Sequence, residues 1–319
     1  MPKRIREYHR PADWAAASEL LRRTDLRVAP LVLGPRPPAS PPADVEAVVD
    51  LSRLDFAYIT QDDKRVLHVG ALTPVQDLAD SPQLKSLANG ILSEAAHLSA
   101  HLGLRNVVMV GGVLVSREGP PEILLALLAL DATVVVRSDD RSAREVVEVN
   151  VADLAPQQVI LEREYGAAET TKAREIPLAG FQPNALASGE LIAEVRFHRP
   201  SAHAGGALAR VARAPRDEAI VAAAAVVEMA DGVCRQVRLA IAGAGRPQRM
   251  ASAEHILEGR PLNDTWLQKA VEAVEAEVNP ISDFRGSAEY RRAMAGVLAR
   301  RALEGAWGRA STDTQRING

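Results

Sequence analysis

Two apolar runs flank a glycine pair near the middle of the chain, within NVVMVGGVLVSREGPPEILLALLALDATVVV, residues 106–136. Short continuous apolar runs of this kind predict a buried strand, a turn at Gly111-Gly112 and a second short strand. After a loop, the apolar positions lose their alternation, which predicts a short helix from Pro121 that passes into a strand at Thr133.

The residues before this stretch alternate between helical and strand patterns. Trp14, Ala17, Leu20 and Leu21 have helical spacing, with Asp13 near the predicted helix start. The remaining predicted elements are a strand over 26–34, a loop over 35–42 that contains five prolines, a strand and turn over 46–54, a strand before a turn at Gly70, a helix that opens at Thr73 with Pro74 in its first position, and a helix over 85–103.

The residues after this stretch predict paired strands followed by helices. The polar segment 138–175 has the pattern of a strand pair of its own and indicates no function. A strand is predicted over 188–200, and two alternating runs joined at Asp231-Gly232 predict a hairpin. Helices are predicted over 251–260, 263–278 and 287–307, and the polar tail from Gly308 is expected to be loose. Together these elements predict an α+β fold.

Composition narrows the possible functions of the chain. Its 319 residues are enough for two domains, and the formal net charge of −3 argues against a nucleic-acid-binding surface. The single cysteine, Cys234, excludes an internal disulfide and a Cys-based zinc or iron–sulfur site. The sequence contains no run of eighteen apolar residues, so no membrane span is predicted. The N-terminus does not resemble a signal peptide, and a cytoplasmic location is therefore expected.

Several polar residues have spacings that occur in functional sites. His97 and His101 are four apart on one predicted helix, which is metal-ligand spacing, but no third ligand is evident, so two structural histidines are favoured. Ser287 is predicted to cap the helix that follows it. The other polar residues of SDFRGSAEYRR, Asp283, Arg285 and Tyr290, are expected to support the fold, and no nucleophile–base pair stands out.

The order of the segments resembles one family, the FAD-binding medium subunits of molybdenum hydroxylases. This family includes the medium subunit of bacterial carbon monoxide dehydrogenase and the flavin domain of xanthine dehydrogenases. The resemblance covers residues 8–307 and rests on YHRPADWAAASELL, HVGALTPVQDL, LRNVVMVGGVL, SGELIAEVRFHRP, ALARVARAPRDEAIVAAAAVV and above all DFRGSAEYRRAMAGVLARRAL.

The resemblance implies a specific domain organisation. The first 180 residues are expected to form a two-part FAD-binding domain of the vanillyl-alcohol-oxidase (PCMH) type, with lobes over 1–55 and 56–180. Residues 181–307 are expected to form an α+β C-terminal domain of the CO-dehydrogenase flavoprotein type, and residues 308–319 a flexible tail.

The first flavin-binding loop of the family corresponds here to VLGPRPP. The family pattern, Ala-Gly-Gly-x-Ser-Leu, uses backbone N–H groups and a serine to hold the FAD pyrophosphate. Leu33, Gly34 and Arg36 are the candidate binding residues here. Pro35 stands at the second glycine and donates no N–H, and Pro37 falls near the serine position.

The second loop corresponds to Met109, Val110, Gly111, Gly112 and Val113. The family pattern is Thr-Ile-Gly-Gly-Asn, so the glycine pair is kept while Met109 and Val113 remove two polar side chains. Paired glycines let N–H groups face a phosphate without a Cβ in the way. The pair is therefore interpreted either as a phosphate turn or as a structural turn inherited from a flavin-binding ancestor.

Three more positions follow from the resemblance. Glu122 stands where the family has an aspartate, Arg210 stands at a lysine position, and Leu208 replaces a tyrosine beside the flavin ring. Each lost hydrogen bond to a charged group costs about 1.5–3 kcal/mol, so these changes are expected to weaken FAD binding.

The resemblance implies that the chain passes electrons from iron–sulfur clusters of a small partner subunit through FAD to an acceptor. A large partner subunit is expected to carry the molybdenum cofactor. The alternative is a homologue that has lost FAD and serves as a structural or assembly subunit. VLGPRPP, Met109, Val113 and Leu208 favour the alternative, and Gly111-Gly112 favours the flavin subunit.

Overall fold

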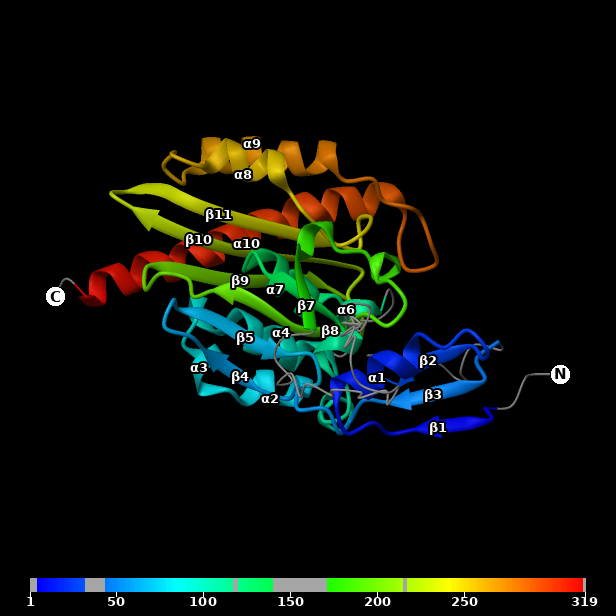
Figure 1. The fold of residues 1–319 in the computed structure, drawn as a ribbon. Helices are drawn as coiled ribbons and strands as arrows, with labels where there is room; N and C mark the ends of the chain where they lie inside the picture. The colour runs from blue at the N-terminus through cyan, green and yellow to red at the C-terminus, as the bar shows by residue number, and fades with distance from the viewer. Residues whose placement is uncertain (1–4, 32–43, 117–119, 140–170, 215–216, 318–319) are drawn as a thin grey trace, which may run out of the picture.

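The computed structural model describes residues 5–31, 44–116, 120–139, 171–214 and 217–317. Its strands form three sheets (Figure 1), and helices lie between and outside them. The mixture of helices and antiparallel strands confirms the α+β class. The first loop and most of the polar segment 138–175 lie outside the described residues.

The first sheet is small and parallel, with strand order β1-β3-β2. Helix α1 connects β1 to β2, and its start is fixed by Asp13, whose carboxylate accepts a hydrogen bond from the Ala16 N–H at 2.8 Å. Ser18 anchors this helix to the rest of the chain by donating to the Gly189 carbonyl at 2.7 Å. The elements are β1 (Glu7–His9), α1 (Trp14–Leu21), β2 (Val28–Leu31) and β3 (Ala47–Asp50).

The second sheet is antiparallel, with strand order β4-β5-β8-β6-β7. Its strands are β4 (Ile59–Gln61), β5 (Val66–Gly70), β6 (Thr133–Asp139), β7 (Thr171–Pro177) and β8 (Leu191–His198). The sequence resemblance assigned residues 191–198 to the C-terminal domain. In the structure β8 pairs with β5 and β6, and its buried apolar side chains contribute to the buried face of this sheet.

Short helices cover the second sheet and fill the space between it and the third sheet. They are α2 (Val75–Asp80), α3 (Pro82–Lys85), α4 (Ile91–Ser99), α5 (Leu102–Arg105), α6 (Val110–Val115) and α7 (Glu122–Ala129), with 3-10 turns η1 (Ala88–Gly90), η3 (Leu178–Gly180) and η4 (Pro183–Ala185). Helix α7 is buried on nearly all sides, which explains why its apolar residues show no amphipathic period.

The third sheet is antiparallel, with strand order β12-β11-β10-β9. The predicted hairpin is confirmed, because Asp231 and Gly232 both have positive φ, 52° and 80°, as a two-residue turn requires. The strands are β9 (Ala204–Val211), β10 (Val221–Ala230), β11 (Val233–Ala242) and β12 (Gln248–Arg249), and the helices that follow are α8 (Ala251–Leu257), α9 (Asp264–Glu277) and α10 (Ala288–Ile317).

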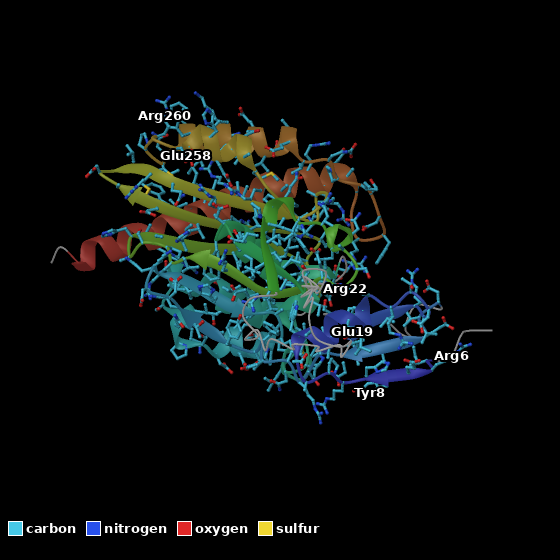
Figure 2. All side chains as sticks on the ribbon, in the orientation of Figure 1. Arg6, Tyr8, Glu19, Arg22, Glu258 and Arg260 are labelled. Carbon is cyan, nitrogen blue, oxygen red and sulfur yellow. The ribbon has the colours of Figure 1, made fainter. Side chains whose placement is uncertain are left out.

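The third sheet is buried on both faces. Along β10, Ala222, Ala224 and Val226 pack into the core shared with α4 and α7, while Ala223 and Ala225 face the core under α8, α9 and α10. Figure 1 shows α8 and α9 stacked above β11 and β10, with α10 crossing the sheet. Figure 2 shows Glu258 and Arg260 at the end of α8, where the Arg260 guanidinium lies 4.7 Å from the Trp266 ring centroid.

Helix α10 approaches β9 closely because both elements present small residues. Ala299, Ala302, Ala306 and Ala310 are fully buried on the helix. Gly205 lies opposite them on β9, where a Cβ atom would collide with the Ala306 carbonyl oxygen. The helix runs to Ile317, well past the predicted end at Trp307, so the polar tail continues the helix.

The Gly205→Ala variant is expected to lower the free energy of unfolding by about 2 kcal/mol, because its methyl group would push α10 off the sheet. Urea denaturation followed by circular dichroism measures this difference. Gly180→Ala is the matched control, since no atom lies within 4 Å of a Cβ at Gly180. Equal stability of the two variants would contradict this packing.

Candidate functional site

The glycine pair lies at the N-terminus of helix α6, and not in a turn between strands. The predicted strand–turn–strand is wrong, because residues 110–115 are helical and Met109 makes only a single bridge, to Pro74. β5 already has β4 and β8 as neighbours, so this segment cannot pair with β5 as a further strand.

Two backbone hydrogen bonds fix the start of α6 against the end of β5. The Val110 N–H donates to the Thr73 carbonyl at 3.0 Å, and the Gly111 N–H donates to the Ala71 carbonyl at 2.7 Å. These are two of the free donors that every helix N-terminus has. They are satisfied by the chain itself and face its core.

The two glycines therefore have different roles. A Cβ at Gly111 would lie 3.0 Å from the Ala71 oxygen, so the close approach of α6 to the end of β5 favours glycine at this position. The next residue, Gly112, is buried. Among the described residues, no acceptor faces its N–H. Gly112 is thus the one of the pair whose N–H has no partner within the described part of the chain.

Side chains at the start of α6 provide no further donors. Met109 occupies the N-cap position, where it makes no side-chain hydrogen bond to the helix. Val110 is fully buried and Val113 is 5% exposed. Among the described residues, the side chains of Met109, Val110 and Val113 therefore add only apolar surface at this helix start.

Glu122 and Arg210 come from distant parts of the chain and lie together in the structure. Arg210 Nε is 3.1 Å from Glu122 Oε1, although Glu122 begins α7 and Arg210 is on β9. The Glu122 side chain is 1% exposed, and neither of its carboxylate oxygens accepts a hydrogen bond within the described residues. The Arg210 guanidinium is close enough to attract the Glu122 carboxylate, but its Nε–H bond does not point at the carboxylate oxygens.

Burial is the main reason why the pKa of Glu122 is raised above the ordinary carboxyl range. The charge of Arg210 lowers this pKa, and the charge of Glu218 raises it. A buried carboxyl group whose oxygens lack hydrogen bonds is costly unless a ligand or a proton compensates it. Such a group is a sign of a binding site.

The other candidate residues are only partly brought into this site. Leu208 is two positions from Arg210 on β9 and therefore faces the same side, but its side chain packs into the core. Leu33, Gly34, Arg36, Pro35 and Pro37 lie outside the described residues.

Sequence reasoning did not find the residues that support Arg210. The guanidinium of Arg210 donates to the Asp217 carbonyl, and the next residue, Glu218, pairs with Arg285 at 3.0 Å. No pattern in the sequence indicated these contacts. The first joins the end of β9 to a residue seven positions later, and the second joins two residues that are 67 positions apart.

The remaining sequence-level candidates have structural roles. His97 is in the last turn of α4 and His101 caps α5, so the expectation of one continuous helix carrying both is wrong. No cluster of three metal-ligating side chains occurs among the described residues. Ser287 caps α10 as predicted, accepting from the Tyr290 N–H at 3.2 Å.

Cys234 is fully buried, as expected of an inert thiol. Its pKa is raised to about 12, first by burial and then by the charge of Glu258. In the part of the chain that the structure describes, no helix combines the length and the apolar character needed to cross a membrane.

The raised pKa of Glu122 makes stability depend on pH in a defined direction. The folded state holds this proton after the unfolded chain has released it, so the stabilisation exists below the ordinary carboxyl pKa and is lost as pH rises through the raised pKa. The melting temperature of Glu122→Gln relative to the unsubstituted protein is therefore expected to increase as the pH rises above the ordinary carboxyl range. Glu94→Gln, at a side chain 40% exposed, is the control and should show no such trend. If the melting temperatures of Glu122→Gln and the unsubstituted protein differ by the same amount at every pH, the raised pKa of Glu122 is contradicted.

Comparisons with known proteins cover both parts of the chain. The model of the FAD binding domain in molybdopterin dehydrogenase matches residues 3–150. The model of the CO dehydrogenase flavoprotein C-terminal domain matches residues 207–306. The second match contains the third sheet and much of α10, and the first contains Gly111, Gly112 and Glu122.

Similar proteins with known names are also subunits of dehydrogenases, in agreement with these two family matches. The 6-hydroxypseudooxynicotine dehydrogenase complex subunit alpha of Paenarthrobacter nicotinovorans is 30% identical over 266 residues, 82% of this chain and 80% of that protein. The carbon monoxide dehydrogenase medium chain of Afipia carboxidovorans is 39% identical over 127 residues, 40% of this chain and 44% of that protein. The fold is similar to that of a chain in reconstituted CO dehydrogenase from Oligotropha carboxidovorans, with a TM-score of 0.76, 26% identity and coverage of 97% of this chain and 100% of that one. The chain therefore belongs to the family of FAD-binding medium subunits of molybdenum hydroxylases.

Proposed function

We propose that this chain binds FAD and passes electrons from the iron–sulfur clusters of a partner subunit to an acceptor. The observation that carries this proposal is the buried Gly112 N–H at the start of α6, which has no acceptor among the described residues. An N–H group in this position can hold a negatively charged pyrophosphate oxygen.

The described residues fit an anionic cofactor at more than one point. Gly112 would donate its N–H to the pyrophosphate, and Arg210 would add a positive charge near the ring system. The Glu122 carboxyl group, whose oxygens have no hydrogen bonds within the described residues, would pair with a polar edge of the cofactor. When bound, FAD would supply the redox chemistry, because it accepts and releases electrons in separate steps.

The protein's own contribution would be to position the cofactor and to exclude water. Val110 and Val113 give the helix start an apolar surface, and Leu208 extends the apolar environment on β9. No side chain among the described residues forms a nucleophile–base pair, so conversion of an organic substrate is assigned to a partner subunit. We infer that the partners are an iron–sulfur small subunit and a molybdenum-cofactor large subunit.

A second function, a structural or assembly subunit without FAD, is favoured by other observations at the same place. The chain itself satisfies the Val110 and Gly111 N–H groups, and Met109 provides no side-chain donor. If the Gly112 N–H is too weak an anchor by itself, the fold would be kept while the cofactor is lost.

The absorbance spectrum of the purified protein distinguishes the two functions, before and after incubation with excess FAD and desalting. Because the buried Gly112 N–H has no acceptor among the described residues, a retained oxidised-flavin band is expected. A protein that stays colourless after this treatment would contradict FAD binding and support the structural subunit.

Restoring a side-chain donor at the N-cap should strengthen FAD binding. The Met109→Thr variant is expected to bind FAD about tenfold more tightly, since one hydrogen bond to a charged group is worth about 1.5–3 kcal/mol. Titration of FAD fluorescence measures the affinity. Val107→Thr, at a 43% exposed position before the helix, is the matched control. Equal affinities of the two variants would place the pyrophosphate away from α6.

A further inference from the structure

A short segment before β4 lies against the residues that end and follow β5. The Gly70 N–H donates to the Tyr58 carbonyl at 2.9 Å. The Leu72 N–H donates to the Phe56 carbonyl at the same distance, 2.9 Å. A Cβ at Gly70 would collide with the Phe56 carbonyl oxygen, so no side chain fits between the two segments here. The turn that provides both acceptors to the start of α6 is therefore packed against a second backbone.

Thr73 connects this segment to α6. Thr73 is 1% exposed, and its hydroxyl accepts a hydrogen bond from the Tyr58 N–H and donates one to the Tyr58 carbonyl, both at 3.0 Å. The Thr73 carbonyl accepts the Val110 N–H, also at 3.0 Å. The side chain of one buried residue is thus bonded to Tyr58, while its main chain holds the first turn of α6.

The Tyr58 side chain is held in turn by the second sheet. Its hydroxyl donates to Glu194 Oε2 at 2.7 Å, and Glu194 Oε1 lies 3.0 Å from His68 Nδ1. Glu194 is 6% exposed on β8, and His68 is on the neighbouring strand β5. Burial, and then the hydrogen bond to Glu194, raise the pKa of Tyr58, so its phenol remains a donor at neutral pH. Tyr58 is therefore a fixed support for Thr73.

The same turn also sets the direction in which α6 begins. The Val75 N–H donates to the Val108 carbonyl at 2.9 Å, next to the hydrogen bond that the Val110 N–H makes. These two bonds align the residues before α6 antiparallel to the turn. A shift of the turn would therefore displace the Gly112 N–H, which belongs to the first turn of the helix.

We propose that Thr73 is a positioning residue for the cofactor site, an inference that rests on the proposed function. Through its two hydrogen bonds to Tyr58, Thr73 fixes the place at which α6 presents the Gly112 N–H. Thr73 acts through α6 and not by contact, because the single hydrogen of its hydroxyl is already donated to Tyr58. An anchoring donor must be held within about 0.5 Å of its productive position, so loss of this support should weaken the binding of FAD.

Removal of the Thr73 hydroxyl tests this role in the full-length chain. Thr73→Val keeps the branched shape of the side chain but loses both hydrogen bonds to Tyr58, and it is expected to weaken FAD binding about tenfold. Thr73→Ser keeps the hydroxyl and should bind FAD as the unsubstituted protein does. Titration of FAD fluorescence measures the affinities.

Ser93→Ala is the matched control for a general loss of stability. Ser93 is 3% exposed on α4, and its hydroxyl donates to the Ala79 carbonyl at 2.5 Å. This variant also deletes a buried hydroxyl, so it should lower the melting temperature but leave the affinity for FAD unchanged. An equal loss of affinity in Ser93→Ala and Thr73→Val would overturn the positioning role.

Hydrogen–deuterium exchange without FAD provides a readout that does not depend on the cofactor. In Thr73→Val, the peptide that covers residues 109–116 should exchange faster than in the unsubstituted protein, and in Thr73→Ser it should exchange at the unsubstituted rate. Unchanged exchange in Thr73→Val would overturn the proposal. If Thr73→Val does not fold, Tyr58→Phe, which removes only the hydrogen bond to Glu194, should show faster exchange and weaker FAD binding to a smaller extent. The absence of both changes in Tyr58→Phe would then overturn it.

The outcomes separate this proposal from the proposed function. If the unsubstituted protein binds no FAD, the proposed function is contradicted, and the exchange of residues 109–116 alone decides whether Thr73 positions α6. If the unsubstituted protein and Thr73→Val bind FAD equally tightly, FAD binding stands and the positioning role is contradicted.

Discussion

The position of α6 depends on two backbone hydrogen bonds, from Val110 to Thr73 and from Gly111 to Ala71. A helix start that is buried must find acceptors for its free N–H groups. The residues that follow β5 provide two, and the helix comes so close to them that residue 111 has little room for a side chain. The Gly112 N–H remains without an acceptor among the described residues, so the same constraint that fixes the fold creates the possible anchor.

Glu122 and Arg210 show how the two halves of the chain meet. One residue starts α7, which packs against β10 and β11 of the third sheet, and the other is on β9 of the same sheet. A buried ion pair is weak evidence for stability, because removing two charges from water costs about as much as their attraction returns. This pair does not form a well-aligned hydrogen bond, which makes a purely structural role harder to justify. Under the proposed function, the cofactor would meet the Glu122 carboxylate oxygens, which accept no hydrogen bond within the described residues.

The sequence predicted the general fold and the family, but not the geometry of the site. Strong local signals succeeded: Asp231-Gly232 forms its hairpin, Asp13 starts α1 and Ser287 starts α10. The prediction of two strands around Gly111 was wrong. A short apolar run does not distinguish a buried helix from a buried strand unless the free edges of the sheets are known. The family resemblance identified Glu122 and Arg210 as separate candidate residues. Their contact with each other, and the ion pair between Glu218 and Arg285, depend on tertiary packing. The contact between Thr73 and Tyr58 likewise joins segments that no local pattern brings together.

The central claim is that the start of α6 keeps a donor for an anionic cofactor. Hydrogen–deuterium exchange of the peptide that covers residues 109–116, with and without FAD, tests it most directly. If the Gly112 N–H binds the cofactor, FAD should slow exchange in this peptide, while a peptide from α9 should be unaffected. Binding of FAD without any change in this peptide would contradict the claim and place the anchor elsewhere in the chain.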